Sequence, residues 1–409
     1  MKMQTIMQKV DKNKPSSSGN SNGNMLGNFL KSNVRQYSMI ISLIFIMVLF
    51  QVLTDGLLLK PLNITNLILQ NSYILVLAIG MVLVIITGHI DLSVGSIAAF
   101  VGAISAILMV NYEIPTVVAV VLSLAIGALI GAWQGFWIAY VKVPAFIVTL
   151  AGMLLFRGLT MIVLEGKSIA PFPESFQKMS TGFMPDVFGG SGLHVTTLII
   201  GIVLSALYVI GEISNRKNQI KHSLDVQPKG VFLAKMAATV VVLNLFTYSL
   251  AMYEGIPNIL IILALLIIVY RFFTNRMKAG RHVYAIGGNE KAALLSGVKT
   301  KRVTFWVFVN MGVLSALSGL LFAARLNAAT PKAGNLFELD AIAACFIGGA
   351  SAYGGIGTVP GAIIGGLVMG IMNNGMSLLG LGIDWQQGIK GLVLLAAVAF
   401  DIYNKNKAS

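Results

Sequence analysis

Apolar runs long enough to cross a lipid bilayer follow one another through almost the whole sequence. A transmembrane helix needs about 20 consecutive, mostly apolar residues, and such runs recur between residues 38 and 402. Hydrophobic residues make up 56% of the 409 residues and charged residues only 11%, whereas soluble domains carry roughly 25% charged residues. Because so few charges cannot cover a large soluble globule, we predict an all-α, polytopic membrane protein.

The runs predict about ten to twelve transmembrane segments, some of them broken or re-entrant. We expect spans near 38–54, 66–87, 93–110, 115–140, 145–164, 194–211, 231–252, 257–273 and 304–325. The last third is rich in glycine and interrupted. It predicts a short segment at 340–352 and helices at 360–379 and 385–402, and 340–379 either crosses twice or forms a re-entrant hairpin.

Lysine and arginine are unevenly distributed between the runs, which predicts the orientation of the chain. Basic residues collect on the cytoplasmic side of membrane proteins, and here they gather in 1–36, 212–230, 274–303 and 404–407. We therefore expect both termini in the cytoplasm, and the loops 55–65, 111–114, 165–192, 253–256 and 326–339 outside. These loops also explain the net charge of +14 without a nucleic-acid partner.

The same distribution divides the chain into three parts. We expect a polar, disordered tail at 1–36, a transmembrane domain at 37–403, and within that domain a cytoplasmic loop at 274–303.

No catalytic site, metal site or cofactor is predicted. The lone cysteine, Cys345, lies in an apolar run, and the histidines His89, His194, His222 and His282 are not at metal-ligand spacing. The segment 165–168 contains Gly-Lys-Ser, but Met161 stands where a phosphate-binding loop needs its first glycine. If ATP drives this protein, another chain must bind it.

The loop at 274–303 predicts a short docking helix. Asn289 is a suitable N-cap, residues 290–296 are good helix formers, and Gly297 is a suitable stop. A plain basic loop held at anionic lipid is the alternative, but it would not need a capped helix with adjacent small residues. The residues expected to dock a partner are Gly287, Gly288, Asn289, Glu290, Ala292, Ala293 and Gly297.

Several motifs resemble those of one transporter family. The segment 291–297 resembles the Ala-Ala-x-x-x-Gly coupling loop of ABC importer permeases, with Glu290 one residue earlier than usual. Segments at 88–96, 143–153, 156–158, 284–289 and 338–350 are similar to signatures of sugar permeases of the ribose/xylose branch. The segments 327–334 and 372–376, and the extra pair of spans at 194–252, resemble most closely the multiple-monosaccharide transport permease. The resemblance covers about 37–403.

The resemblance implies a type II-like ABC importer permease of the bacterial inner membrane. It implies a homodimer that forms the path for monosaccharides such as xylose, with the ATPase subunit docked at 287–297. A sugar-binding protein would dock outside, near 165–192 and 326–339, and membrane lipid would surround the spans. A proton-coupled sugar carrier, with Asp91 or Glu338 titrating, is the alternative. A channel or a scaffold is a third class.

Polar residues within the spans are candidates for the translocation path or a gate. They are Gln70, Asn71, His89, Asp91, Arg157, Asn373 and Asn374. Charges in a membrane are costly and often functional, but a buried ion pair, for instance Asp91 with Arg157, is the structural alternative. The amides either bind sugar hydroxyls or join helices to one another. Glu338, Asp340 and Lys390 are further charges in the last third.

Two stretches, 80–110 and 341–375, are faintly alike. Each is an apolar run that reaches a Gly/Ser-rich break and continues as a helix of small residues. Internal repeats with broken helices are common in transporters, whereas chance similarity between glycine-rich membrane segments is the alternative.

Overall fold

The computed structural model describes residues 34–189, 192–224 and 226–408. Apart from its last three residues, which begin the first helix, the predicted tail 1–36 lies outside the described residues. The elements are α2 (Val34–Leu53), α3 (Pro61–Ile86), α4 (Val94–Ala106), η1 (Ile107–Asn111), α5 (Thr116–Phe136), η2 (Trp137–Val141), α6 (Ala145–Val163), α7 (Glu174–Thr181), α8 (Val195–Lys221), α9 (Lys229–Ala251), α10 (Asn258–Arg276), α11 (Lys278–Gly288), α12 (Glu290–Leu295), α13 (Thr300–Leu326), α14 (Phe337–Ile347), α15 (Val359–Leu378) and α16 (Ile383–Ala408).

The prediction of an all-α membrane protein is confirmed. Nine helices among the described residues are long and apolar enough to cross a membrane, and α2 and α16, of 20 and 26 residues, are also long enough. The helix α14 has 11 residues, about 17 Å, so it spans only half of a bilayer. It completes a crossing together with the irregular segment 327–336.

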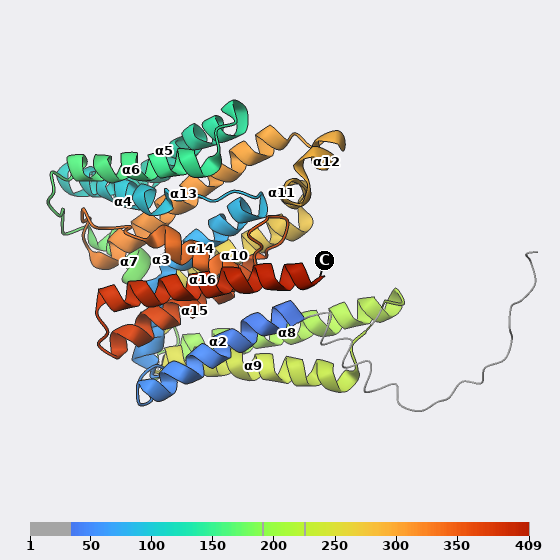
Figure 1. Ribbon diagram of the computed structural model, residues 1–409. Coiled ribbons are helices and arrows are strands. Elements are labelled where there is room, and N and C mark those ends of the chain that lie inside the picture. The colour runs from blue at the N-terminus through green and yellow to red at the C-terminus, as the bar shows by residue number, and fades with distance from the viewer. Residues whose placement is uncertain (1–33, 190–191, 225, 409) are drawn as a thin grey trace, which may run out of the picture.

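The long helices lie side by side, and their ends define two faces of the molecule (Figure 1). The short helices α11 and α12 lie at one end, together with the C-terminal end of α16, and α7 lies at the opposite end. We call these the α12 end and the α7 end. The helices α3 and α13 form the buried centre, whereas α9 lies at the periphery with most of its surface exposed.

Glycines allow the central helices to approach closely. Gly312 of α13 packs against the backbone of Gly127 and Gly131 of α5, and Gly127 packs in turn against Ala316. A Cβ at Gly312 would overlap the carbonyl oxygen of Gly127. Small residues at such crossings are typical of membrane helices, where close van der Waals contact replaces the hydrophobic effect as the driving force.

Two breaks interrupt the buried centre and run in opposite directions. The chain leaves α3 at the α12 end, returns to mid-depth through residues 87–93, and continues toward the α7 end as α4. It leaves α13 at the α7 end, returns to mid-depth through 327–336, and continues as α14 toward the α12 end. The order of α3 to α6 is thus repeated, inverted, in α13 to α16, which is a common plan of transporters.

This pairing corrects the predicted repeat. The sequence suggested that 80–110 matches 341–375, but the break at 87–93 corresponds to 327–336, which precedes the expected stretch. The glycine-rich segment 348–358 instead joins α14 to α15 at the α12 end. The prediction relied on glycine-rich sequence, which indicates tight turns. It therefore selected the wrong segment, because the second mid-depth break consists mainly of other residues.

Hydropathy failed to predict the length of α8 and the presence of α7 and α11, whereas it located the last three helices correctly. The helix α8 continues to Lys221, into the first part of the predicted loop 212–230, because the apolar run ends before its hydrogen-bonded turns do. The helices α7 and α11 were not predicted, since both are short, amphipathic and surface-bound. The predicted short segment 340–352 and helices 360–379 and 385–402 are confirmed as α14, α15 and α16, with small shifts in their bounds.

Candidate functional site at the two helix breaks

The two breaks meet at mid-depth. A Cβ added to Gly95, at the start of α4, would overlap the carbonyl oxygen of Gly334, and one added to Gly334 would overlap that of Gly95. Gly334 has a φ of +68°, which a glycine adopts without strain. From α6, Arg157 donates hydrogen bonds to the carbonyl oxygens of Ala333, at 2.7 Å, and Gly334, at 3.2 Å. The guanidinium therefore fixes the second break against the start of α4.

Arg157 does not pair with Asp91. The buried Asp91 carboxylate accepts hydrogen bonds from the backbone NH of Ser93, at 2.8 Å, and from its hydroxyl, at 2.6 Å. Gln134 of α5 donates to the same hydroxyl, at 2.8 Å. The predicted ion pair is wrong because both groups find nearer partners on the broken backbone. Asp91 shapes the first break and ties it to α5.

A second acidic group follows the other break. The buried carboxylate of Asp340 on α14 pairs with Lys390 of α16, at 3.0 Å, and accepts a longer hydrogen bond from Tyr73 of α3, at 3.4 Å. The ring of Tyr73 stacks on Phe337, with centroids 3.9 Å apart. Each half of the inverted repeat thus carries an acid next to its break, but only Asp340 has a basic partner.

Glu338 differs from both of these acids. It is only 5% exposed, and its Oε2 has no hydrogen-bond partner among the described residues. A Cβ at Gly95 would lie 2.5 Å from this oxygen, so the carboxyl group lies against the first turn of α4. The carboxyl group therefore lies where the two breaks meet.

Below the first break a cavity of about 420 Å³ opens toward the α12 end. His89 lines it and packs against the ring of Phe308, with centroids 5.9 Å apart. Lys142 and Glu290 line its mouth and approach each other to 3.4 Å. Both side chains are more than half exposed, so this ion pair stabilises the mouth by about 1 kcal/mol or less.

The structure confirms the predicted short helix at 290–296 as α12. The Asn289 side chain accepts a hydrogen bond from the backbone NH of Ala292, at 3.0 Å, as an N-cap does. Gly297 follows the helix with a φ of +84°, the conformation in which glycine ends helices. Local sequence alone determines these ends, which is why the prediction succeeded.

The preceding helix α11 connects this end to the breaks. The Tyr284 hydroxyl donates to the carbonyl oxygen of Gly357, at 2.8 Å. Gly287 packs against the Ile86 carbonyl at the end of α3 and against Gly355, whose NH donates to the same Ile86 carbonyl at 2.9 Å. The helix α11 is therefore in direct contact with the end of α3, which leads into the first break.

Of the two alanines predicted to dock a partner, Ala292 is exposed and Ala293 is buried. Ala293 is buried against Ile286 and Val298, so it positions the helix and presents no surface of its own. Leu294 and Leu295 are 59% and 90% exposed. A Cβ at Gly288 would meet nothing within 4 Å, so this glycine is also open to a partner. Sequence reasoning named the alanines and missed the leucines.

The predicted amides are distributed between helices rather than gathered in one site. Asn374 of α15 exchanges hydrogen bonds with Asn63 of α3, at 2.8 and 3.1 Å. Asn71 donates to the Leu67 carbonyl of its own helix and packs against Gly370. Asn373 lies beside the Asp340 carboxylate, and Gln70 is half-buried. The alternative, that amides join helices, describes Asn374 and Asn71 best.

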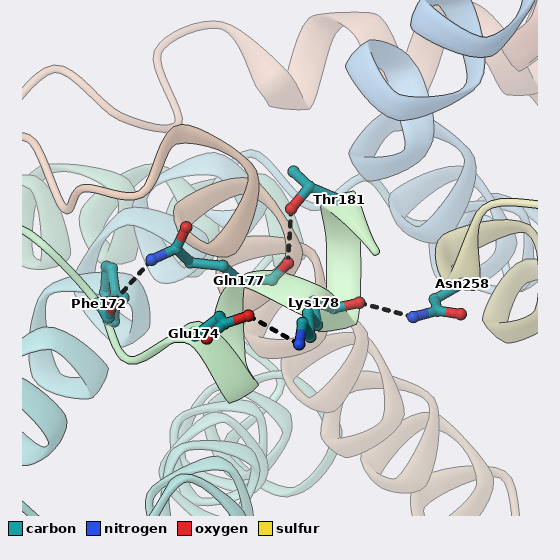
Figure 2. Close-up of polar contacts among 6 residues, drawn as sticks. All are labelled: Phe172, Glu174, Gln177, Lys178, Thr181 and Asn258. Atoms are coloured by element: carbon teal, nitrogen blue, oxygen red, sulfur yellow. Dashed lines mark hydrogen bonds and ion pairs between the residues drawn. The ribbon is translucent and has the colours of Figure 1, made fainter. Parts of the chain in front are cut away.

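At the α7 end, α7 and the loops on either side of it form what we call the cap, and polar contacts join α7 to its neighbours (Figure 2). Within α7 Glu174 and Lys178 form an ion pair, at 2.7 Å, and the Asn258 side chain at the start of α10 donates to the Lys178 carbonyl, at 2.8 Å. Gln177 donates to the Phe172 carbonyl, also at 2.8 Å. The cap is therefore a fixed surface rather than a loose loop.

Asp186 anchors the rest of this cap. Its carboxylate accepts hydrogen bonds from the hydroxyl of Thr196, at 2.6 Å, and from the backbone NH groups of Thr196 and Val195 at the start of α8. These bonds, that of the Thr196 hydroxyl above all, lower the pKa of Asp186 to about 2. The carboxylate is charged at every physiological pH.

Taken together, these features are those of a transport protein. The centre contains two opposed helix breaks with charged side chains beside them. Broken helices that meet at mid-depth are typical of proteins that move a solute by exchanging two conformations.

Comparison with known proteins gives the family. Residues 63–398 match the permease component of the branched-chain amino acid transport system, and the chain belongs to this family. It is 42% identical to the xylose transport system permease protein XylH of Haemophilus influenzae over 375 residues, which are 91% of this chain and 97% of that protein. XylH of Escherichia coli is 38% identical over 372 residues, 91% and 93% of the two chains. The ribose import permease protein RbsC of Escherichia coli is 35% identical over 341 residues, 83% and 85% of the two chains. No solved structure is significantly similar to the chain.

Several residues of the site were not predicted. Gln134, Tyr73 and Asn63 bond to partners that lie far away in the sequence, so no local pattern marks them. Ser93 bonds to Asp91, two residues earlier, and this short Asp-x-Ser spacing was the local signal that could have marked it. The pairing of Lys390 with Asp340 did have a signal. A lysine alone in an apolar span requires an acidic partner, and few acids are available in the last third of the chain.

Proposed function

We propose that the chain is the membrane-spanning subunit of an ATP-driven importer of monosaccharides. The relatives are named for xylose and ribose, so pentoses are the first substrates to test, beginning with xylose. Two copies would enclose one path, since the family resemblance implies a homodimer. The breaks at 87–93 and 327–336, with Asp91, Arg157 and Glu338, would act as the gate.

One observation carries this proposal: α12 offers an exposed apolar docking surface that is mechanically connected to the gate. Leu295 is 90% exposed although it lies on a helix whose two ends are fixed by local caps. Behind it, α11 contacts the end of α3 and the loop before α15 through Gly287 and Tyr284. An ATPase that binds α12 would therefore move the breaks as it opens and closes.

The orientation follows from this arrangement and from the basic loops. We place the α12 end and both termini in the cytoplasm, in the bacterial inner membrane, and the α7 end outside. The folded cap around α7 then supplies a surface for a sugar-binding protein, and basic side chains at the α12 end contact anionic lipid. Labelling tests the orientation: in a Cys345→Ala chain, a cysteine placed at Lys291 should react only with a membrane-permeant reagent in intact cells.

Uptake in vesicles tests the mechanism. Purified chain alone should not concentrate xylose or ribose under a proton gradient. Adding the ATPase, the sugar-loaded binding protein and ATP should start accumulation, because a permease is moved between states only by partners that bind those states differently. If a proton gradient alone drives accumulation, the chain is a carrier instead, and Asp91 and Glu338 become the first candidates for the proton site.

A further inference from the structure

A second and larger cavity lies beside the central helices, away from the breaks. It measures about 700 Å³ and lies between α10, α11 and the first half of α13. Its wall is apolar, with Val269 and Phe273 of α10, Val283 of α11 and Val303 of α13, whereas His282, Lys299 and Arg302 lie at one end. The proposed sugar path does not use this cavity, and its apolar wall does not suit a sugar.

The cavity follows the axis of α13, one of the helices long and apolar enough to span a membrane. Along α13 it extends from Arg302 to Asn310, which at 1.5 Å per residue is about 12 Å. Trp306 lies between them and is 55% exposed, and tryptophan favours the boundary between headgroups and acyl chains. One end is therefore at headgroup depth, and the other reaches well into the hydrocarbon, whose half-thickness is about 15 Å.

Among the described residues, the basic end has no acidic partner. The salt bridges among the described residues are Lys142–Glu290, Lys178–Glu174 and Lys390–Asp340, so Lys299 and Arg302 pair with no carboxylate there. At the deep end, Asn310 accepts a hydrogen bond from Tyr270, and its buried Nδ2 has no partner in the described part of the chain. The cavity thus combines two basic side chains at headgroup depth, with no carboxylate partner among the described residues, an apolar slot, and the unbonded Nδ2 of Asn310.

We propose that this cavity binds one anionic glycerophospholipid of the inner leaflet. The phosphate lies at Lys299 and Arg302, one acyl chain fills the slot between α10 and α13, and an ester oxygen or water reaches Asn310. Basic pockets between membrane helices on the cytoplasmic side suit such headgroups. The lipid packs against α11, the helix that connects the docking end to α3. The inference relies on the proposed orientation of the α12 end.

Fluorescence quenching by lipids brominated on the acyl chain tests the proposal. The full chain is placed in vesicles with Trp306 as its only tryptophan, Trp133, Trp137 and Trp385 being replaced by phenylalanine. Brominated phosphatidylglycerol should quench Trp306 at a lower mole fraction than brominated phosphatidylcholine. A chain that keeps only Trp133, which is 41% exposed on α5, should show no such preference.

Matched charge removal separates a site from a general surface effect. K299Q/R302Q should lower the preference for phosphatidylglycerol by about 30-fold, as expected for two basic contacts. K278Q/K301Q removes the same charge from exposed residues that do not line the cavity, and it should change the preference much less. Excess inorganic phosphate should not displace the lipid.

Four results would overturn the proposal. They are equal quenching by the two lipids, an equal loss in both double variants, displacement by phosphate alone, and no quenching of Trp306, which would mean that protein covers the cavity. Because the brominated lipids occupy both leaflets and no transport is measured, these results do not depend on sugar uptake. An error in the proposed orientation would appear only in the labelling experiment.

Discussion

Replacing Leu295 with alanine tests the docking surface most directly. The side chain is 90% exposed in the free chain, so nearly all of its apolar surface is available to a partner. The substitution removes three carbons, each worth about 0.8 kcal/mol when buried. We therefore expect a loss of about 2 kcal/mol, or about 30-fold, in the affinity for the ATPase. Since so little of Leu295 is buried, the free energy of unfolding of the permease should change by less than about 0.5 kcal/mol.

The assay measures binding of the ATPase to the permease in detergent by calorimetry, together with the thermal midpoint of the permease alone. Leu245→Ala is the control, because Leu245 is 62% exposed and belongs to α9, which lies at the periphery of the molecule, away from α12. Unchanged binding by Leu295→Ala, or an equal loss in the control, would refute the docking surface.

A tryptophan at Gly288 gives an independent test, since a Cβ added at this exposed glycine meets no atom within 4 Å in the free chain. It should abolish uptake without affecting membrane insertion, and normal uptake would contradict docking there. Ala293→Trp is not equivalent, because Ala293 is buried and overpacking costs about 1–3 kcal/mol.

Three further predictions concern the charged side chains of Lys390, Arg157 and Asp186. Lys390→Met should lower stability by roughly 3–5 kcal/mol, because it leaves the buried Asp340 carboxylate unpaired. Adding Asp340→Asn should restore part of the thermal midpoint, and no recovery would argue against the pair. Arg157→Met removes two charge-assisted bonds to the second break and should cost about 2–4 kcal/mol. Exchanging Arg157 and Asp91 should bring no rescue, and any rescue would restore the ion-pair hypothesis. Asp186 has a folded pKa of about 2, below its unfolded value, so its stabilisation is complete above about pH 4 and is lost as the pH falls toward 2. The difference in thermal midpoint between parent and Asp186→Asn should therefore disappear over that range, and a constant difference would contradict the assignment.

Local signals determined much of this protein. Long apolar runs gave the membrane fold and most helix positions, because a bilayer admits few other solutions for such sequences. Asn289 and Gly297 gave the ends of α12 correctly, since a cap depends only on residues within one turn. Family motifs gave the permease class, which the relatives support.

Tertiary structure alone decided what the polar residues do. Arg157 bonds to Gly334 and not to Asp91, and Asp340 pairs with Lys390, because each partner is brought near by helices that are distant in the sequence. Hydropathy and local spacing cannot show which of several acids a buried cation will meet. For the same reason the exposure of Leu295 could not be predicted, because a leucine in an apolar chain stands out only when the fold leaves it exposed. The sequence thus determined which segments form long apolar helices, and the packing of the two inverted halves determined the contacts at the two breaks, the exposure of Leu295 and the cavity between α10 and α13.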